Sequence, residues 1–206
     1  SQDAVIKLAP RAGIELDENL TPAEKLKVVQ GLMEQDDPRA QKVFADIGKY
    51  LGYTVVEYSH FYDIHYLMVL GRVMSGKGGV GKSTVSANFA LALAAEGARV
   101  GMLDADIYGP SQPTMLGAKG QPTIRDGVNM DPIESLGLQI NSVGFMIDPE
   151  EPMIWRGPLV AQALTQLLNQ TAWDNLDYLV IDMPPGTGDV QLTLSQSVPV
   201  TGAVVV

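Results

Sequence analysis

Ten residues near the middle of the chain constrain its fold more than any others. Residues 75–84 read SGKGGVGKST and match the pattern G-x-x-x-x-G-K-[ST], with a second lysine directly after the first glycine. Residues 66–70 and 73–74 before this segment are apolar, as in a buried strand, and residues 85–96 after it have the pattern of a helix. A strand, a glycine-rich turn and a helix in this order predict a phosphate-binding loop, with the helix dipole directed at the phosphates.

The residue types in this loop are suited to a nucleotide. Glycines let backbone N–H groups wrap closely around phosphate oxygens, Lys82 places a cation on the outer phosphates, and the Ser83 hydroxyl can ligate Mg²⁺. A glycine-rich turn without a ligand is the alternative, but it would not require the lysine and the hydroxyl at these positions. We therefore predict that the following residues bind a nucleotide: Gly76, Gly78, Gly79, Val80, Gly81, Lys82, Ser83 and Thr84.

From about residue 66 onward, strand, loop and helix patterns alternate, which predicts an α/β fold with a parallel sheet and helices on both faces. We expect further strands at residues 99–103, 138–145, 178–181 and 202–206, and a helix at 158–169. Ligands of such sheets bind at the carboxyl ends of the strands, where Asp104, Asp106 and Asp182 stand. Asp182 directly follows an apolar strand and is a candidate Mg²⁺ ligand, and residues 183–189 after it have the prolines and glycines of a switch loop.

The first part of the chain has a different character. Thr21, Pro22 and Glu24 form the pattern of a capping box and predict a helix up to about Glu34. A second helix begins after Asp37, and its apolar face is predicted to consist of Val43, Phe44, Ile47, Leu51, Val55 and Tyr58. We expect two parts, a helical segment at residues 1–65 and a nucleotide-binding domain at 66–206, and we expect residues 1 to about 60 not to build the ATP site.

Composition excludes several classes of function. The formal net charge is −10, which argues against general attraction to nucleic acid or to an anionic membrane. No apolar run is long enough for a membrane span and no secretory leader is visible, so we expect a cytoplasmic protein. The chain contains no cysteine, which excludes disulfides, thiol catalysis and thiolate metal sites within it.

Four segments together resemble the Mrp/ApbC group of iron–sulfur cluster carrier ATPases, within the deviant P-loop class that includes MinD and ParA. The resemblance covers about residues 74–206 and rests on SGKGGVGKST, LDADIYGPSQP, WRGP and DYLVIDMPPGTGDVQLTLSQSVPVTGAVVV. It implies a Mg²⁺-dependent ATPase that acts as a homodimer and delivers clusters to scaffold or acceptor apo-proteins. It also implies that Lys77 reaches across the dimer to the partner's phosphates and that Asp104 or Asp106 orients the attacking water.

The chain also departs from this family. Members carry a Cys-x-x-Cys pair beyond the point where this chain stops, so we expect a truncated domain, incomplete at its C-terminus, that binds no cluster without those thiolates. Residues 1–70 do not resemble the family, and a natural fusion, a fragment or a sequence-assembly join all remain open. Two other functions remain open as well: a MinD/ParA-like positioning or partitioning ATPase, and a fragment without catalytic activity.

Overall fold

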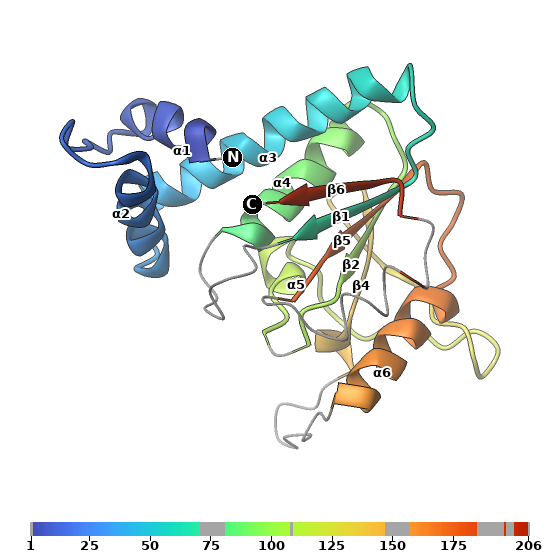
Figure 1. The fold of residues 1–206 in the computed structure, drawn as a ribbon. Helices are drawn as coiled ribbons and strands as arrows, with labels where there is room; N and C mark the ends of the chain where they lie inside the picture. The colour runs from blue at the N-terminus through green and yellow to red at the C-terminus, as the bar shows by residue number, and fades with distance from the viewer. Residues whose placement is uncertain are drawn as a thin grey trace.

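The computed structural model describes residues 2–70, 81–107, 109–146, 157–184, 196 and 200–205. Its described strands form one sheet in the order β3-β4-β2-β5-β1-β6 (Figure 1). All neighbouring strands run parallel except β3 and β4, which are antiparallel. The strands are β1 (Tyr66–Leu70), β2 (Val100–Asp104), β3 (Ile133–Ser135), β4 (Leu138–Ser142), β5 (Tyr178–Asp182) and β6 (Gly202–Val205).

Helices cover both faces of the sheet, and α4 and α6 lie on opposite sides (Figure 1). Within β1, Leu67 and Val69 belong to the hydrophobic cluster of α4, whereas Met68 belongs to the cluster of α6. This alternation follows from the two-residue period of a strand buried on both faces. The helices are α1 (Gln2–Leu8), α2 (Pro22–Glu34), α3 (Pro38–Ser59), α4 (Lys82–Ala95), α5 (Gln112–Met115) and α6 (Gly157–Gln170), with 3₁₀ turns η1 (Pro10–Ala12) and η2 (Val143–Phe145).

The predicted α/β class is confirmed, and one strand differs from the expectation. The strand expected at residues 138–145 ends at Ser142, whose hydroxyl accepts a hydrogen bond from the backbone N–H of Gly144 at 3.0 Å and begins the turn η2. The short edge strand β3 was not expected. The prediction that residues 73–74 form a strand concerns residues outside those described.

Two of the helices that precede the sheet, α2 and α3, begin where the sequence predicts. Thr21 and Glu24 form the expected capping box of α2, and Asp37 caps α3 by accepting a hydrogen bond from the backbone N–H of Arg39. Helices α1 and α2 lie around the first half of α3, beyond the edge of the sheet (Figure 1). The second half of α3 runs along α4, so α3 links the N-terminal helices to the sheet.

Glycines bring α3 and α4 into close contact. A Cβ atom added at Gly48 would lie 2.5 Å from the backbone oxygen of Val85, and one added at Gly52 would meet the Cβ of Ala92.

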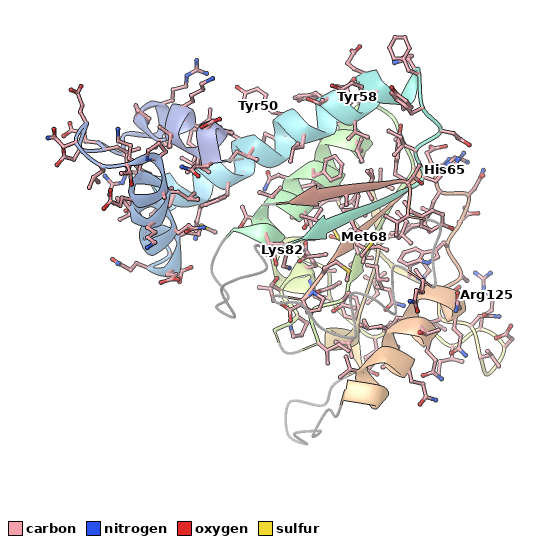
Figure 2. The ribbon with its side chains drawn as sticks, viewed as in Figure 1. Tyr50, Tyr58, His65, Met68, Lys82 and Arg125 are labelled. Atoms are coloured by element: carbon pink, nitrogen blue, oxygen red, sulfur yellow. The ribbon has the colours of Figure 1, made fainter. Side chains whose placement is uncertain are left out.

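The prediction of the apolar face of α3 is only partly right. Its members Phe44 and Ile47 are buried, but Tyr58 is 54% exposed and points away from α4 (Figure 2). Hydrophobic spacing cannot identify a contact made by residues without side chains.

We expect Gly48→Ala to destabilise the protein by about 1–3 kcal/mol, because the new methyl group forces α3 away from α4. Gly31→Ala in α2 is the matched control, since nothing lies within 4 Å of a Cβ added there. It should leave stability unchanged or raise it by about 0.5–1 kcal/mol, the usual preference for alanine in a helix. Urea denaturation measures both. Equal effects of the two substitutions would show that α3 does not pack on α4 in this way.

Candidate functional site

Polar and charged side chains gather at the carboxyl ends of the two central strands. The register of the sheet places Asp104, the last residue of β2, directly beside Asp182, the last residue of β5. Lys82 and Ser83 open α4 next to them. Figure 2 shows Lys82 at this end of the sheet. Asp104, Asp182 and Lys82 are all buried, although charged side chains rarely are unless they are paired.

Lys82 and Asp182 form a buried ion pair. The Lys82 Nζ lies 2.5 Å from Oδ1 of Asp182, and the two side chains are 6% and 0% exposed. The same ammonium also donates a hydrogen bond to the Ser83 hydroxyl at 3.4 Å. The hydroxyl of Ser86 donates to the same carboxylate oxygen of Asp182 at 3.0 Å. One positive charge therefore stands between the two groups that the sequence predicts as Mg²⁺ ligands, Ser83 and Asp182.

Gln112, which sequence reasoning missed, connects three parts of the site. Its Nε2 donates hydrogen bonds to Oδ2 of Asp182 at 2.8 Å and to the backbone oxygen of Ser83 at 3.0 Å. Its backbone N–H donates to Oδ2 of Asp104 at 3.0 Å. The side chain is fully buried at the first position of α5. Gln112 lies within the segment LDADIYGPSQP, but no spacing or residue pattern in it predicts such a role; its position near the two predicted acids is the signal that could have drawn attention to it.

Asp104 is held by several donors and is closed to solvent. It accepts hydrogen bonds from the backbone N–H groups of Asp106 and Gln112 and from the Ser142 hydroxyl. Its pKa is raised to about 7, first because the carboxyl is buried and second because the charge of Asp182 is close by; the two backbone hydrogen bonds oppose these effects. A pKa of about 7 means that this carboxyl gains or loses its proton near neutral pH. Its hydrogen bonds with the backbone N–H groups of Asp106 and Gln112 hold the loop that follows β2.

Asp106 occupies a different environment from Asp104. Its side chain is half-buried, and its Oδ1 accepts a hydrogen bond from the backbone N–H of Gly109 at 3.2 Å. Of the two aspartates after β2, only Asp106 has part of its surface open to solvent. The two aspartates, which the sequence could not separate, therefore differ in their exposure to solvent.

The other predicted binding residues are divided between described and undescribed parts of the chain. Gly81 has φ 81° and lies against the ring of Phe44, leaving no room for a Cβ, and Thr84 lies half-buried in the first turn of α4. Phe44 therefore brings α3 to the end of the glycine-rich loop. The remaining positions lie outside the described residues: Gly76, Lys77, Gly78, Gly79, Val80 and the expected switch residues 185–189.

The donor set suits Mg²⁺ bound together with a nucleotide. In the part of the chain that the structure describes, no group of three or more acidic or histidine side chains could hold a metal ion alone. Mg²⁺ usually binds one or two protein oxygens together with phosphate oxygens and water. The Ser83 hydroxyl and the Asp182 carboxylate, which already flank the ammonium of Lys82, fit that requirement.

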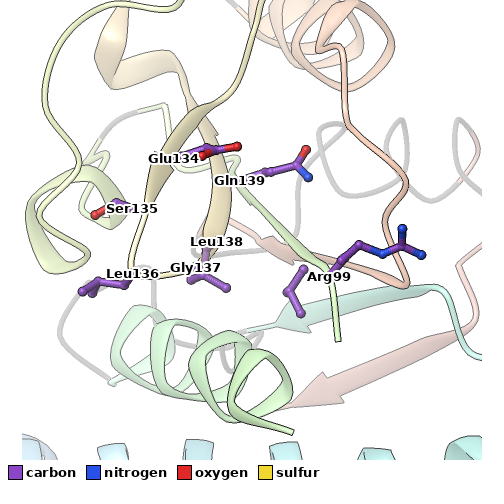
Figure 3. Close-up of a pocket in the computed structure, with 8 residues that line it drawn as sticks. Arg99, Glu134, Ser135, Leu136, Gly137, Leu138 and Gln139 are labelled. Atoms are coloured by element: carbon purple, nitrogen blue, oxygen red, sulfur yellow. The ribbon is translucent and has the colours of Figure 1, made fainter. Parts of the chain in front are cut away.

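A separate pocket lies at the opposite end of the strands. It is lined by Arg99, Val100 and the β3–β4 hairpin, residues 134–139 (Figure 3). None of the predicted site residues lines it.

No helix within the described ranges is long and apolar enough to cross a membrane.

Comparison with curated proteins identifies close relatives of the second part of the chain. The chain is 65% identical over 135 residues to the iron-sulfur cluster carrier protein of Escherichia coli (strain K12), and 67% identical over 135 residues to that of Haemophilus influenzae. It is 52% identical over 136 residues to the iron-sulfur cluster transfer protein NUBPL of Mus musculus. Each match covers 65% of this chain but only 37%, 36% and 43% of those proteins, so the chain spans less than half of their length.

Solved structures agree on the fold. A nucleotide-binding protein from Archaeoglobus fulgidus, solved in complex with ADP, superposes with a TM-score of 0.57 at 40% identity, over 69% of this chain and 53% of that one. The kinase domain of VpsO superposes with a TM-score of 0.56 at 21% identity, over 82% of this chain and 81% of that one, and shows the fold alone.

The family model that matches describes a NUBPL iron-transfer P-loop NTPase of the ParA group, and it covers residues 68–206. This range contains the glycine-rich loop, the buried Lys82–Asp182 pair and both aspartates after β2. It also agrees with the resemblance to the Mrp/ApbC carriers. The chain belongs to the Mrp/ApbC-type iron–sulfur cluster carrier P-loop NTPases of the NUBPL family.

Proposed function

We propose that this chain binds and hydrolyses ATP with Mg²⁺ as the nucleotide-binding part of an iron–sulfur cluster carrier. The observation that carries the proposal is the buried pair of Lys82 and Asp182 at the N-terminus of α4, beside the Ser83 hydroxyl. A helix N-terminus attracts phosphate, and a lysine and a hydroxyl at this point are the groups that a phosphate-binding loop requires.

In this proposal, Lys82 changes its partner when ATP binds. In the nucleotide-free chain its ammonium neutralises Asp182, which would otherwise be a buried unpaired charge. The phosphates then attract the ammonium, and Asp182 is released. Mg²⁺, held by Ser83 and Asp182, would neutralise charge on the transferring phosphoryl group. The site thus holds a cation beside Asp182 both before and after nucleotide binding.

We further propose that Asp106 orients the attacking water and that Asp104 supports the loop. The oxygens of Asp104 already accept hydrogen bonds from three donors of the protein, which leaves them committed to the chain itself. Asp106 is half-buried and follows two residues later. Its backbone N–H is itself held by Asp104, so the position of Asp106 depends on that buried carboxyl.

Phosphate release from Mg²⁺-ATP tests this proposal. The unmodified chain should hydrolyse ATP, and Asp106→Asn should lower the rate about 100-fold or more, the usual contribution of a residue that orients or deprotonates a nucleophile. Its affinity for ATP should change less than about threefold, because binding depends on the phosphate loop. Asp63→Asn is the matched control, since this aspartate is 91% exposed and precedes the start of β1, at the end of the strands opposite the site.

Two outcomes of that experiment would contradict parts of the proposal. An unmodified chain without phosphate release above background would contradict ATP hydrolysis by this chain. Full activity of Asp106→Asn would show that Asp106 does not orient the attacking water, but it would not contradict the proposal that the chain hydrolyses ATP.

The partner and the cargo are also proposals. We propose that two copies of the protein meet face to face, so that Lys77 of each copy reaches the phosphates of the other, and that the assembly hands clusters to scaffold or acceptor apo-proteins. The 65% identity to the E. coli iron-sulfur cluster carrier protein supports this cargo. Because the chain contains no cysteine, the thiolates that hold the cluster would not come from these residues.

A further inference from the structure

One buried polar atom in the site has no partner among the described residues, and it belongs to Gln112. The side chain of Gln112 is fully buried, yet its Oε1 accepts no hydrogen bond from any residue that the structure describes. The hydroxyl of the preceding residue, Ser111, is likewise buried with no partner in the described ranges. A buried acceptor without a donor costs about 1–3 kcal/mol, so such atoms in a folded chain call for an explanation.

The orientation of the Gln112 amide follows from its neighbours. Its nitrogen lies 2.8 Å from Oδ2 of Asp182 and 3.0 Å from the backbone oxygen of Ser83, and both of these atoms only accept hydrogen bonds. The opposite orientation would place three oxygens against one another. The Oε1 atom shares its amide carbon with the Nε2 that contacts Asp182 and Ser83, and it has no hydrogen-bond donor among the described residues.

Among the described residues, the charged side chains of the site do not donate a hydrogen bond to Oε1. An ionised Asp182 cannot donate a hydrogen bond, and Lys82 directs its ammonium to Asp182 and Ser83. A donor that arrives with a ligand would satisfy Oε1. A water molecule on a bound Mg²⁺ ion is such a donor, because Mg²⁺ keeps several waters when it binds to one or two protein oxygens.

We infer that Gln112 is a positioning residue for the metal: its Oε1 accepts a hydrogen bond from a water molecule of the Mg²⁺ ion that binds with the nucleotide. This inference rests on the proposed function. It assigns to Gln112 a role in the affinity for the metal, separate from the affinity for the nucleotide itself. Through its backbone N–H, the same residue ties this metal contact to Asp104 and the loop after β2.

The test compares the affinity for fluorescent ADP with Mg²⁺ and with EDTA, which gives the increment due to the metal without any hydrolysis. Gln112→Met keeps the volume but removes donor and acceptor, and it should reduce the increment about tenfold, as expected for loss of one hydrogen bond in a charged network. Its affinity in EDTA should change less than about twofold. A merely structural role would lower both affinities together.

A second variant separates the two ends of the amide. Gln112→Glu keeps an oxygen in place of Oε1 and replaces the donor with a second acceptor beside Asp182. It should retain the metal increment but lower the stability of the nucleotide-free chain, because two carboxylates then meet without a donor between them. Gln139→Met is the matched control: both polar atoms of that glutamine are paired with Asp174, at the other end of the strand, and the metal increment should not change.

Each outcome decides the inference. A full increment in Gln112→Met, equal losses with Mg²⁺ and EDTA, or loss of the increment in Gln112→Glu would overturn it while leaving the proposed function intact. Absence of ADP binding by the unmodified chain would overturn the proposed function and this inference with it. If Gln112→Met fails to fold, the retained increment of Gln112→Glu still carries the test.

Discussion

Lys82→Met is expected to lower the affinity for ATP at least about 100-fold, because it removes the only charge that the predicted loop sequence directs at the outer phosphates within one subunit. Methionine keeps most of the length and apolar surface of the lysine side chain. The loss should appear equally with ADP, and it can be measured by isothermal titration calorimetry.

The same substitution should destabilise the nucleotide-free chain by about 3–5 kcal/mol, because Asp182 then stays buried as an unpaired charge. The control is the double variant Lys82→Met with Asp182→Asn, in which neither charge remains. It should be less destabilised than the sum of the two single variants by at least about 1 kcal/mol. Strict additivity would show that the pair does not form in the free chain, and unchanged ATP affinity would show that Lys82 does not bind phosphate.

Lys77→Ala is expected to keep nucleotide affinity and to lose hydrolysis by about 10³-fold, as in systems where a cation is supplied by a partner subunit. If Lys77 acts across a two-fold interface, only a dimer of loaded subunits can hydrolyse ATP. The initial rate of the unmodified protein should therefore rise with the square of its concentration where monomers prevail, and become linear once dimers saturate.

The dimer prediction is checked by measuring phosphate release over a dilution series at saturating Mg²⁺-ATP, alongside sedimentation of the same samples. A rate that stays linear in protein concentration across the monomer–dimer transition would exclude a role for Lys77 in the partner's site. An equal loss of nucleotide affinity in the Lys77 and Lys82 variants would contradict the division of roles between the two lysines.

The main features of the fold could be predicted because each rests on a strong local signal. The capping box marks the start of α2, and the apolar runs that become β1, β2 and β5 are buried on both faces. Strand β3 could not be predicted, because it has only three residues and its hairpin turn lacks the usual signal. That turn places Leu136 at φ 52° and Gly137 at φ 78°, whereas asparagine or aspartate is usual at the first position.

The sequence predicts the acidic residues and the lysine of the candidate site, but not the contacts that these residues make with one another and with Gln112. Strand ends and the loop pattern point to Asp104, Asp182 and Lys82, and the structure brings these three together. That Lys82 pairs with Asp182 depends on the order of strands in the sheet, which the sequence does not contain. Gln112 is recognised only once α5 is folded against that end of the sheet, because its side chain contacts Ser83 and Asp182, which are distant from it in sequence.

The central claim is that this end of the sheet is a Mg²⁺-nucleotide site, and calorimetric titration of the unmodified chain with a non-hydrolysable ATP analogue tests it most directly. We predict saturable binding of one nucleotide per chain, weakened about tenfold or more when EDTA replaces Mg²⁺, because Asp182 and Ser83 contribute through the metal. A chain that is folded by circular dichroism and unfolds cooperatively, yet binds no nucleotide with or without Mg²⁺, would contradict the claim.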